Sequence, residues 1–482
     1  MRIPVTYAGD TIMRRAMVIV AMLVLAAGFS QARASTVNET VTLSSGPNLT
    51  INSSFVGLSF EKKWLTVDYF TSTNTAVINL FNMLGSGVVR IGGGTVDTYN
   101  WAGIEHCTPI TGAQVDSLAG FMKQVPNWKV IYGLNFASNT AVDCSNEAAY
   151  VSPDLGSQLL GFEIGNEPDE YGVGGNTLRD SSFTYDTGSD SYIPEWNPLK
   201  IAAHQYGDLV GPATASFTAG HWEWTTNFAY DEASIISMAT RHYYGGVPSG
   251  GYGDPATMIS LITNNPALPG DISREVSAVN SDGHSVASGG LRVDESGSIV
   301  NGGQWGVSDA FGSAQWALDY MFILALNGVQ GVNFHGGGKS AYCPIFDNNN
   351  GVVTRIGPEY YALAMFSMIP AGKVVSATIS PSQPFYTAYG VNLSSGGTAV
   401  LLNNKDTAKT MNTTVNLGSG VASATLMKLT GTSWYQTNGF TLGGAIITTN
   451  GTWSGSGSTV TTSGGSVTVA VPPYNSFLLV PN

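Results

Sequence analysis

The spacing of hydrophobic and polar residues changes once along this chain. From residue 56 to about residue 370, short apolar runs alternate with stretches in which apolar residues recur at helical spacing. After residue 371 the chain is rich in Thr, Ser, Val and Gly, with alternating apolar positions as in Ser466-Val-Thr-Val-Ala-Val471. The two regions therefore predict repeated β-α units followed by an all-β part.

The first region predicts eight strands with helices between them. The expected strands span residues 56–60, 87–91, 129–135, 159–164, 208–210, 236–243, 291–295 and 329–334, and the expected helices include 74–84, 114–124, 311–326 and 359–368. Eight parallel strands with interposed helices close into a (β/α)8 TIM barrel, whose functional sites lie at the carboxyl ends of the strands.

The expected fold class is α/β, with a TIM barrel over residues 55–370 and a C-terminal antiparallel β-sandwich over residues 371–482. Residues 35–54 show short polar-apolar alternation and are expected to add strands to the sandwich. The sandwich contains no aromatic stripe that would mark a carbohydrate-binding platform. We therefore interpret it as a packing module.

The amino end has the pattern of a signal peptide. Arg14 and Arg15 precede an apolar run over residues 16–28, and Ala32-Arg-Ala34 supplies small residues for cleavage. The run is short for a membrane span. Residues 1–34 are thus expected to be removed, leaving a secreted or periplasmic protein without a membrane segment.

The net charge and the absence of certain motifs indicate which ligands and cofactors the protein is not expected to bind. The formal net charge is −13, and the expected mature part has no cluster of Lys and Arg. Such a chain is not expected to bind nucleic acid, and a highly sulfated polyanion is disfavoured. The sequence has no His-Glu-x-x-His or paired-cysteine pattern and no glycine-rich loop in a nucleotide-binding context, so neither metal nor cofactor is expected.

Three cysteines allow at most one disulfide. Cys107 and Cys144 lie in predicted loops that flank the third strand, which makes them the candidate pair and leaves Cys343 free. Three unpaired thiols are the alternative interpretation.

The strongest candidate chemistry lies in the segment Leu159–Asp169, with the sequence LLGFEIGNEPD. An apolar run predicts a buried strand that stops at Gly165 and is followed by Asn166, Glu167 and Pro168. A carboxylate at the carboxyl end of a barrel strand points to catalysis. Glycoside hydrolysis needs a second carboxylate that attacks the anomeric carbon or activates water.

Two glutamates compete for that second role. Glu275 lies among Ile272, Val276 and Val279 at helical spacing, which predicts a solvated residue on a helix face. Glu295 ends a short β-type run entered from a Gly-Gly turn and followed by the Gly-rich segment 301–306. We therefore interpret Glu295, at a second strand end, as the partner of Glu167.

These residues, taken in order, resemble glycoside hydrolase family 79, the family of β-glucuronidases and heparanases. The resemblance covers most of the chain after the leader. Its motifs are Val56-Gly-Leu-Ser-Phe-Glu61, Val89-Arg-Ile-Gly-Gly93, Gly133-Leu-Asn135, Gly165-Asn-Glu-Pro-Asp169, His242-Tyr-Tyr-Gly245, Glu295-Ser-Gly-Ser298, Gly302-Gly303, the segment 306–319, Asn333-Phe-His-Gly336 and Pro358-Glu-Tyr-Tyr361.

The resemblance implies a retaining mechanism with Glu167 as acid and base and Glu295 as nucleophile, their carboxyls about 5 to 5.5 Å apart. It implies that Asn166 binds the sugar 2-hydroxyl and that His335 and Tyr342 line the sugar pocket. His242 and Tyr244 alternate on one strand and so share a face, where the tyrosine hydroxyl can orient the nucleophile. Glu61 and Asp97, at the ends of the first two strands, are further candidates for hydroxyl contacts.

One departure from the family concerns the substrate. Glucuronate-cleaving members carry a tyrosine a few residues beyond the nucleophile, which holds the sugar carboxylate together with amides of the following glycines. This chain has Ser298-Ile-Val-Asn301 there and Gly297 in place of an Asn, although Gly302 and Gly303 remain. Glucuronate recognition is therefore less well supported than hydrolysis.

Four interpretations follow. The first is an exo-acting β-glucuronidase that cleaves glucuronides or 4-O-methylglucuronides from a carbohydrate substrate. An endo-acting, heparanase-like β-glucuronidase is disfavoured by the acidic charge, whereas a β-glycosidase for a neutral sugar is kept open by the missing tyrosine. A non-catalytic sugar-binding protein fits worst, because both carboxylates are present.

Overall fold

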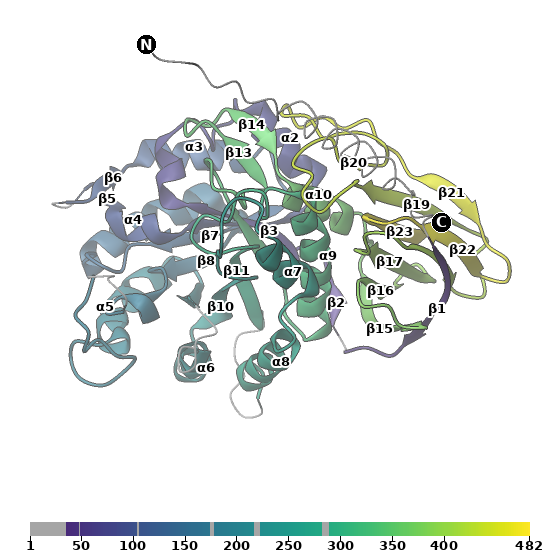
Figure 1. Ribbon diagram of the computed structural model, residues 1–482. Coiled ribbons are helices and arrows are strands. Elements are labelled where there is room, and N and C mark those ends of the chain that lie inside the picture. Colours follow the sequence, from purple (N-terminus) through teal and green to yellow (C-terminus); the bar gives the residue numbers. More distant parts are fainter. Residues whose placement is uncertain (1–34, 48, 104–105, 174–177, 216–221, 282–288) are drawn as a thin grey trace, which may run out of the picture.

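The computed structural model describes residues 35–47, 49–103, 106–173, 178–215, 222–281 and 289–482. The predicted signal peptide, residues 1–34, lies outside the described residues. The described chain forms a barrel and a β-sandwich side by side, with the barrel on the left of Figure 1 and the sandwich on the right. None of the described helices is long and apolar enough to cross a membrane.

The predicted TIM barrel is confirmed. Eight parallel strands close in the order β10-β11-β12-β3-β4-β7-β8-β9. They are β3 (Val56–Glu61), β4 (Gly87–Gly92), β7 (Trp128–Leu134), β8 (Leu159–Ile164), β9 (Leu209–Thr214), β10 (Ile236–Tyr244), β11 (Leu291–Gly297) and β12 (Val332–Gly336). Because strands of such a barrel are covered on both faces, their sequences are almost continuously apolar.

Alternation along the strands explains how polar groups enter the barrel. Val88, Ile131, Val210 and Met238, from four strands, pack together in one small cluster. Side chains two residues apart share a face of a strand. Arg90, two residues beyond Val88, therefore points to the same interior, nearer the carboxyl end of β4.

The helices form the outer layer of the barrel (Figure 1). They are α2 (Thr75–Met83), α3 (Gly112–Met122), α4 (Ala141–Leu155), α5 (Tyr192–His204), α6 (Trp222–Asp231), α7 (Pro255–Thr263), α8 (Leu268–Val279), α9 (Phe311–Leu326) and α10 (Pro358–Ser367). Short elements decorate the loops: η1 (Lys62–Thr66), η2 (Gly94–Thr98), η3 (Gly156–Gln158), η4 (Pro168–Glu170), and the pairs β5 (Tyr99–Trp101) with β6 (Thr108–Ile110) and β13 (Ile345–Asp347) with β14 (Val353–Ile356).

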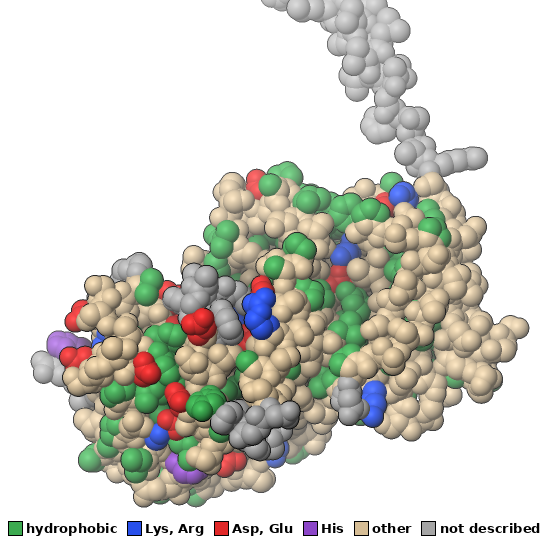
Figure 2. Space-filling model, turned by 90° about the horizontal axis from the view of Figure 1, so that it is seen from below, with side chains coloured by type: hydrophobic (Ala, Val, Ile, Leu, Met, Phe, Trp, Pro, Cys, Tyr) green, Lys and Arg blue, Asp and Glu red, His purple; other side chains and the backbone are tan. Residues whose placement is uncertain are grey.

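The sandwich is one curled sheet in which the strand order begins β20-β19-β23-β17-β16-β15 and ends β1-β18-β22. Its strands are β1 (Thr36–Ser44), β2 (Thr50–Ile51), β15 (Gly372–Ser380), β16 (Tyr386–Leu393), β17 (Thr398–Asn404), β18 (Thr410–Asn416), β19 (Ser423–Thr430), β20 (Thr441–Leu442), β21 (Ser458–Thr461), β22 (Ser466–Val471) and β23 (Asn475–Pro481). The first described strand, β1, pairs antiparallel with β15 and parallel with β18, so the sheet is mixed. On the face in Figure 2, the sandwich presents mostly uncharged side chains and backbone.

A buried polar network holds the sandwich to the barrel. Lys405, directly after β17, forms an ion pair with Asp319 of α9 and donates to the carbonyl of Ile262 at 2.8 Å. Thr387 and Asn403 of the sandwich also donate to Asp319, at 2.6 and 2.8 Å. Since both charges are almost completely buried, this contact depends on both partners being present.

Lys405→Met should therefore destabilise the protein by about 3 to 5 kcal/mol, because it leaves the Asp319 carboxylate buried without its cation. Urea unfolding followed by circular dichroism measures this change. Lys428→Met, which removes an exposed lysine of the same sandwich, is the matched control. Equal midpoints for the two variants would contradict the assigned role of Lys405.

Candidate active site

Glu167 stands just beyond the carboxyl end of β8. Its backbone is left-handed, with φ 51° and ψ 51°, and its N–H donates to the carbonyl of Ala213 at 2.9 Å. A left-handed glutamate is uncommon and indicates a conformation imposed by its surroundings. Its side chain is 30% exposed, and one carboxylate oxygen lies 2.8 Å from Nδ1 of His242 on β10.

Glu295 lies near the end of β11 and is held on both oxygens. Tyr244 donates its hydroxyl to one oxygen at 2.7 Å, and Nη1 of Arg90 donates to the other at 2.7 Å. His335 lies 3.5 Å from the second oxygen. Burial alone would raise the pKa of Glu295. The positive charges of His335, His242 and Arg90 outweigh burial and lower this pKa well below its usual range. Glu295 is thus held in its ionised form, the form that a carboxylate nucleophile would need.

The two carboxylates lie close together, and Nδ1 of His242 is 2.8 Å from one and 3.9 Å from the other. One oxygen of Glu167 and one of Glu295 lie within 4.8 Å of each other, and a nitrogen of His242 lies within the same distance of both. Three such donors can in principle surround a cation. Here, however, His242 already contacts Glu167, and Tyr244 and Arg90 donate to Glu295, so the arrangement fits a catalytic carboxylate pair.

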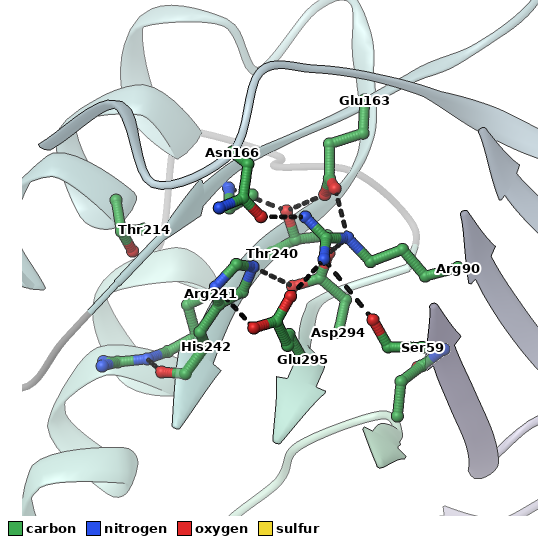
Figure 3. A network of polar contacts seen from close by, with 12 residues as sticks. Ser59, Arg90, Glu163, Asn166, Thr214, Thr240, Arg241, His242, Asp294 and Glu295 are labelled. Carbon is green, nitrogen blue, oxygen red and sulfur yellow. Dashed lines mark hydrogen bonds and ion pairs between the residues drawn. The ribbon is translucent and has the colours of Figure 1, made fainter. Parts of the chain in front are cut away.

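A buried network below this pair was not predicted from the sequence (Figure 3). Arg90 lies at its centre and contacts Glu163 at 2.5 Å and Asp294 at 3.1 Å in addition to Glu295. Glu163 also accepts from Thr240 at 2.8 Å. A signal for this network was present, because an arginine or a glutamate inside an otherwise apolar strand is rarely buried without a partner.

Three carboxyl groups in this network share one arginine. Burial and the charge of Glu163 raise the pKa of Asp294 well above its usual range. Burial also raises the pKa of Glu163, but the charge of Arg90 outweighs burial and lowers that pKa. These opposite shifts favour a protonated Asp294 beside an ionised Glu163.

Asp294→Asn should consequently keep most of the activity, because an uncharged amide can replace the protonated, uncharged carboxyl. Glu163→Gln should lower kcat by up to about a hundredfold, because it removes the charge that orients Arg90 beneath the nucleophile. The comparison of kcat and its pH profile for the two variants measures this asymmetry. Equal losses would contradict a proton on Asp294.

Most of the other predicted pocket residues lie near Glu295, and Gly302 lies farther from it. Asn166 accepts from Nη2 of Arg90 at 2.9 Å, which turns its amide nitrogen away from the arginine. His335 contacts Ser59 at 3.0 Å and lies 3.8 Å from Glu61, and the Tyr342 ring centre is 5.6 Å from that of Tyr244. These residues gather around Glu295. Gly302 lies farther along the same rim, where its carbonyl accepts from Ala341 at 2.6 Å.

Asp97 is used differently from the prediction. One of its oxygens accepts from the N–H groups of Phe136 and Ala137, both at 3.1 Å, and the other accepts from the hydroxyl of Tyr171. Burial raises its pKa to about 6. Asp97 therefore fastens the loops after β7 and β8, and its carboxylate is not turned to a sugar hydroxyl.

Two further expectations were wrong. Glu275 is not a solvated helix residue, because it is buried and accepts from the guanidinium of Arg241. The candidate disulfide does not form, since Cys107, Cys144 and Cys343 are all free thiols. Cys107 contacts Ser138 at 3.3 Å, whereas Cys144 is buried and lies 3.6 Å from the carbonyl of Leu199.

Glu359, at the start of α10, supports the end of the strand that carries Glu295. It is fully buried and accepts from the N–H of Ser298 at 3.2 Å. Burial raises its pKa from 4.5 to about 8. Between these values the folded state binds more protons than the unfolded state, so the free energy of unfolding should fall as pH rises from 4.5 to 8.

Glu359→Gln should remove this part of the pH dependence, because glutamine keeps the acceptor and cannot ionise. Urea unfolding of both proteins at pH 5 and pH 8 measures it. Glu223→Gln, at an exposed position of α6, should behave like the wild type. A parallel loss of stability in wild type and Glu359→Gln would refute the assignment.

Comparison with known proteins adds to this geometry. No family model matches the chain. The β-glucuronidase of Aspergillus niger is 23% identical over 293 residues, which are 55% of this chain and 52% of that protein. Heparanase-like protein 3 of Arabidopsis thaliana is 23% identical over 325 residues, 63% of this chain and 56% of that protein. The chain thus matches about half the length of these curated relatives.

A solved structure supports the fold over nearly the whole chain. The 4-O-α-L-rhamnosyl-β-D-glucuronidase of Fusarium oxysporum superposes with a TM-score of 0.70 at 19% identity, covering 92% of this chain and 100% of that one. At 19% identity this structural similarity shows the fold alone, whereas the curated relatives are similar in sequence. Together they confirm the resemblance to the β-glucuronidases and heparanases of glycoside hydrolase family 79 that the sequence motifs predicted.

Proposed function

We propose that this protein is a retaining glycoside hydrolase that acts as an exo-β-glucuronidase. The observation that carries the proposal is the pair Glu167 and Glu295, which have oxygens within 4.8 Å of each other. Retaining enzymes hold their carboxyls about 5 to 5.5 Å apart, whereas inverting enzymes need about 6.5 to 9.5 Å to admit a water molecule. The curated relatives and the Fusarium structure, which are named glucuronidases or heparanase-like, support the same class.

In the first step, Glu295 attacks the anomeric carbon while Glu167 protonates the glycosidic oxygen. The bond to the leaving group breaks, and a covalent glycosyl-enzyme forms on Glu295. Arg90 and Tyr244 hold the two oxygens of Glu295, so the nucleophile is fixed in position before the substrate binds.

In the second step, the Glu167 carboxylate takes a proton from water, which attacks the anomeric carbon and releases Glu295. Two inversions at one carbon retain its configuration. Nδ1 of His242 lies 2.8 Å from a carboxylate oxygen of Glu167, and which of the two donates depends on the proton carried by the ring. This contact keeps Glu167 aimed at the same point.

The sugar carboxylate needs a recognition site without the tyrosine of other family members. The N–H of Gly303 donates to the carbonyl of Val300 in its own loop at 3.3 Å. The N–H of Gly302 has no hydrogen-bond partner within the described part of the chain. The neighbouring loop adds Lys339, which is exposed and has no ion pair or hydrogen bond to the described residues. A glycine amide and a lysine supply donors that suit a carboxylate.

A β-glycosidase for a neutral sugar is the second candidate, favoured by the missing tyrosine. An endo-acting enzyme for sulfated chains is disfavoured by the net charge of −13 and by the scattering of Lys and Arg on the face in Figure 2. The leader at residues 1–34 supports the further proposal that the enzyme is exported.

The test is hydrolysis of p-nitrophenyl β-glucuronide and β-glucoside side by side, with wild type and Lys339→Met. A strong preference for the glucuronide that Lys339→Met weakens supports both the substrate and its recognition. A preference for the glucoside would transfer the same mechanism to a neutral sugar. Hydrolysis of neither compound, nor of other β-glycosides, would reject the proposed function.

A further inference from the structure

Three exposed aromatic side chains gather beside the candidate active site. Tyr252 is 76% exposed, Trp305 is 45% exposed and Tyr435 is 38% exposed. They belong to the loop after β10, the loop after β11 and the β19–β20 connection of the sandwich. Exposed aromatic groups that cluster from separate segments mark a binding surface more often than single exposed residues do.

Glycines bring these segments together. Gly253 N–H donates to the carbonyl of Trp305 at 2.9 Å. A Cβ atom at Gly306, which has φ 78°, would lie 2.8 Å from the Tyr252 ring, and one at Gly253 would lie 3.9 Å from the Tyr435 ring. The Tyr252 ring therefore lies against the backbone of Gly306, and most of its surface remains open to solvent.

Buried side chains support this surface from below. Gln304 donates to the carbonyls of Ser249 and Gly251 at 2.8 and 2.6 Å, joining the two barrel loops. Asp309, only 3% exposed, accepts from Gly306 N–H at 2.5 Å and from Arg355 at 3.1 Å. The guanidinium of Arg355 in turn lies 5.6 Å from the Trp305 ring centre. The loops are thus braced without a ligand, which reduces the entropy lost on binding.

The surface continues outward from the catalytic pair. Its two barrel loops follow the strands that carry His242, Tyr244 and Glu295, so they lie at the same end of the barrel. The loop after β11 also packs close to the predicted sugar pocket. A Cβ atom at Gly303 of this loop would lie 2.8 Å from the backbone nitrogen of Tyr342, whose ring neighbours that of Tyr244. A substrate that extends beyond the cleaved sugar would therefore emerge at the end of the barrel where these rings lie.

We propose that Tyr252 and Trp305, with Tyr435 at the edge, bind a neutral pyranose ring of an oligosaccharide substrate, beyond the sugar that is released. The apolar face of a pyranose packs on an aromatic ring, while its hydroxyls can bond the phenol and indole tips. Nearby charges are already engaged, since Asp254 accepts from Thr257 at 2.8 Å and Arg355 pairs with Asp309. The inference rests on the proposed glycosidase function.

The experiment compares p-nitrophenyl β-glucuronide with a trisaccharide in which β-glucuronate caps two neutral pyranoses. Tyr252→Ala and Trp305→Ala should each lower kcat/KM for the trisaccharide by about tenfold, mainly through KM. Both variants should keep the small substrate within about twofold of wild type. Tyr230→Ala is the matched control, because this tyrosine is exposed near the C-terminal end of α6, which lies at the opposite end of the barrel.

Unchanged trisaccharide kinetics in both variants would overturn the inference and leave the glucuronidase proposal intact. A loss for p-nitrophenyl and naphthyl glucuronides without a loss for the trisaccharide would also overturn it, in favour of an apolar leaving group. If the wild type cleaves neither substrate, titration of the trisaccharide and of free glucuronate into each protein still decides the matter. Tighter trisaccharide binding that is lost in Trp305→Ala supports the surface, and equal binding rejects it.

Discussion

Glu295→Gln should lower kcat by roughly 10⁴-fold or more, because glutamine cannot form the covalent glycosyl-enzyme. The amide also accepts from only one of the two donors that hold the carboxylate, Arg90 and Tyr244. Turnover of p-nitrophenyl β-glucuronide, or of the glycoside that the wild type prefers, measures the effect.

Asp208→Asn makes the same carboxylate-to-amide change at an exposed position just before β9, at the opposite end of the barrel, and should leave turnover unchanged. Thermal unfolding of both variants separates lost chemistry from lost folding. If folded Glu295→Gln retains activity within tenfold of wild type, Glu295 is not the nucleophile, and the retaining mechanism fails with it.

Glu167→Ala should have an effect that depends on the leaving group. For aglycones that need protonation, such as an alcohol or a sugar, the rate should fall by about 10²- to 10⁴-fold, the usual contribution of general acid catalysis. For 2,4-dinitrophenyl glycosides, whose leaving group departs without a proton, formation of the glycosyl-enzyme should remain fast. Steady-state and burst kinetics on both kinds of substrate measure the difference.

Azide gives an independent readout of the same variant. The alanine leaves space beside the anomeric carbon and removes the base, so azide should attack the glycosyl-enzyme and release a β-glycosyl azide. A product with the α configuration would contradict a retaining mechanism with Glu295 as nucleophile. A loss that is equal for all leaving groups would instead assign Glu167 a role other than acid and base.

The barrel and its two candidate catalytic carboxylates were accessible from the sequence for a physical reason. Parallel strands covered on both faces are short apolar runs, and helices between them show a different period, so the elements can be located one by one. Segment 159–164 was predicted with the bounds that β8 has in the structure. A polar residue directly after such a run lies at the catalytic end of a barrel, which singled out Glu167 and Glu295.

Residues inside the strands were harder to interpret. Arg90, Glu163 and Asp294 lie 73 to 204 positions apart in the sequence, yet they form one buried network. Glu275 was interpreted as solvated because its helical spacing does not reveal that Arg241, 34 positions earlier, points at it. Local periodicity predicts the face of a helix or strand on which a side chain lies. It does not predict which charged residue from another segment that side chain will contact.

The sequence by itself determined the eight barrel strands and their order along the chain, the barrel class, and the two carboxylates at strand ends. All of these depend on the local spacing of apolar residues and on where each run stops. Only the tertiary structure decided which oxygens of Glu295 bind Arg90 and Tyr244, and that Asp97 binds the backbone of a neighbouring loop. It also decided that the cysteines remain unpaired. The same holds for the proximity of Tyr252, Trp305 and Tyr435. Those facts depend on strand register and loop packing between distant segments, because buried charges and aromatic rings acquire their roles from neighbours in space.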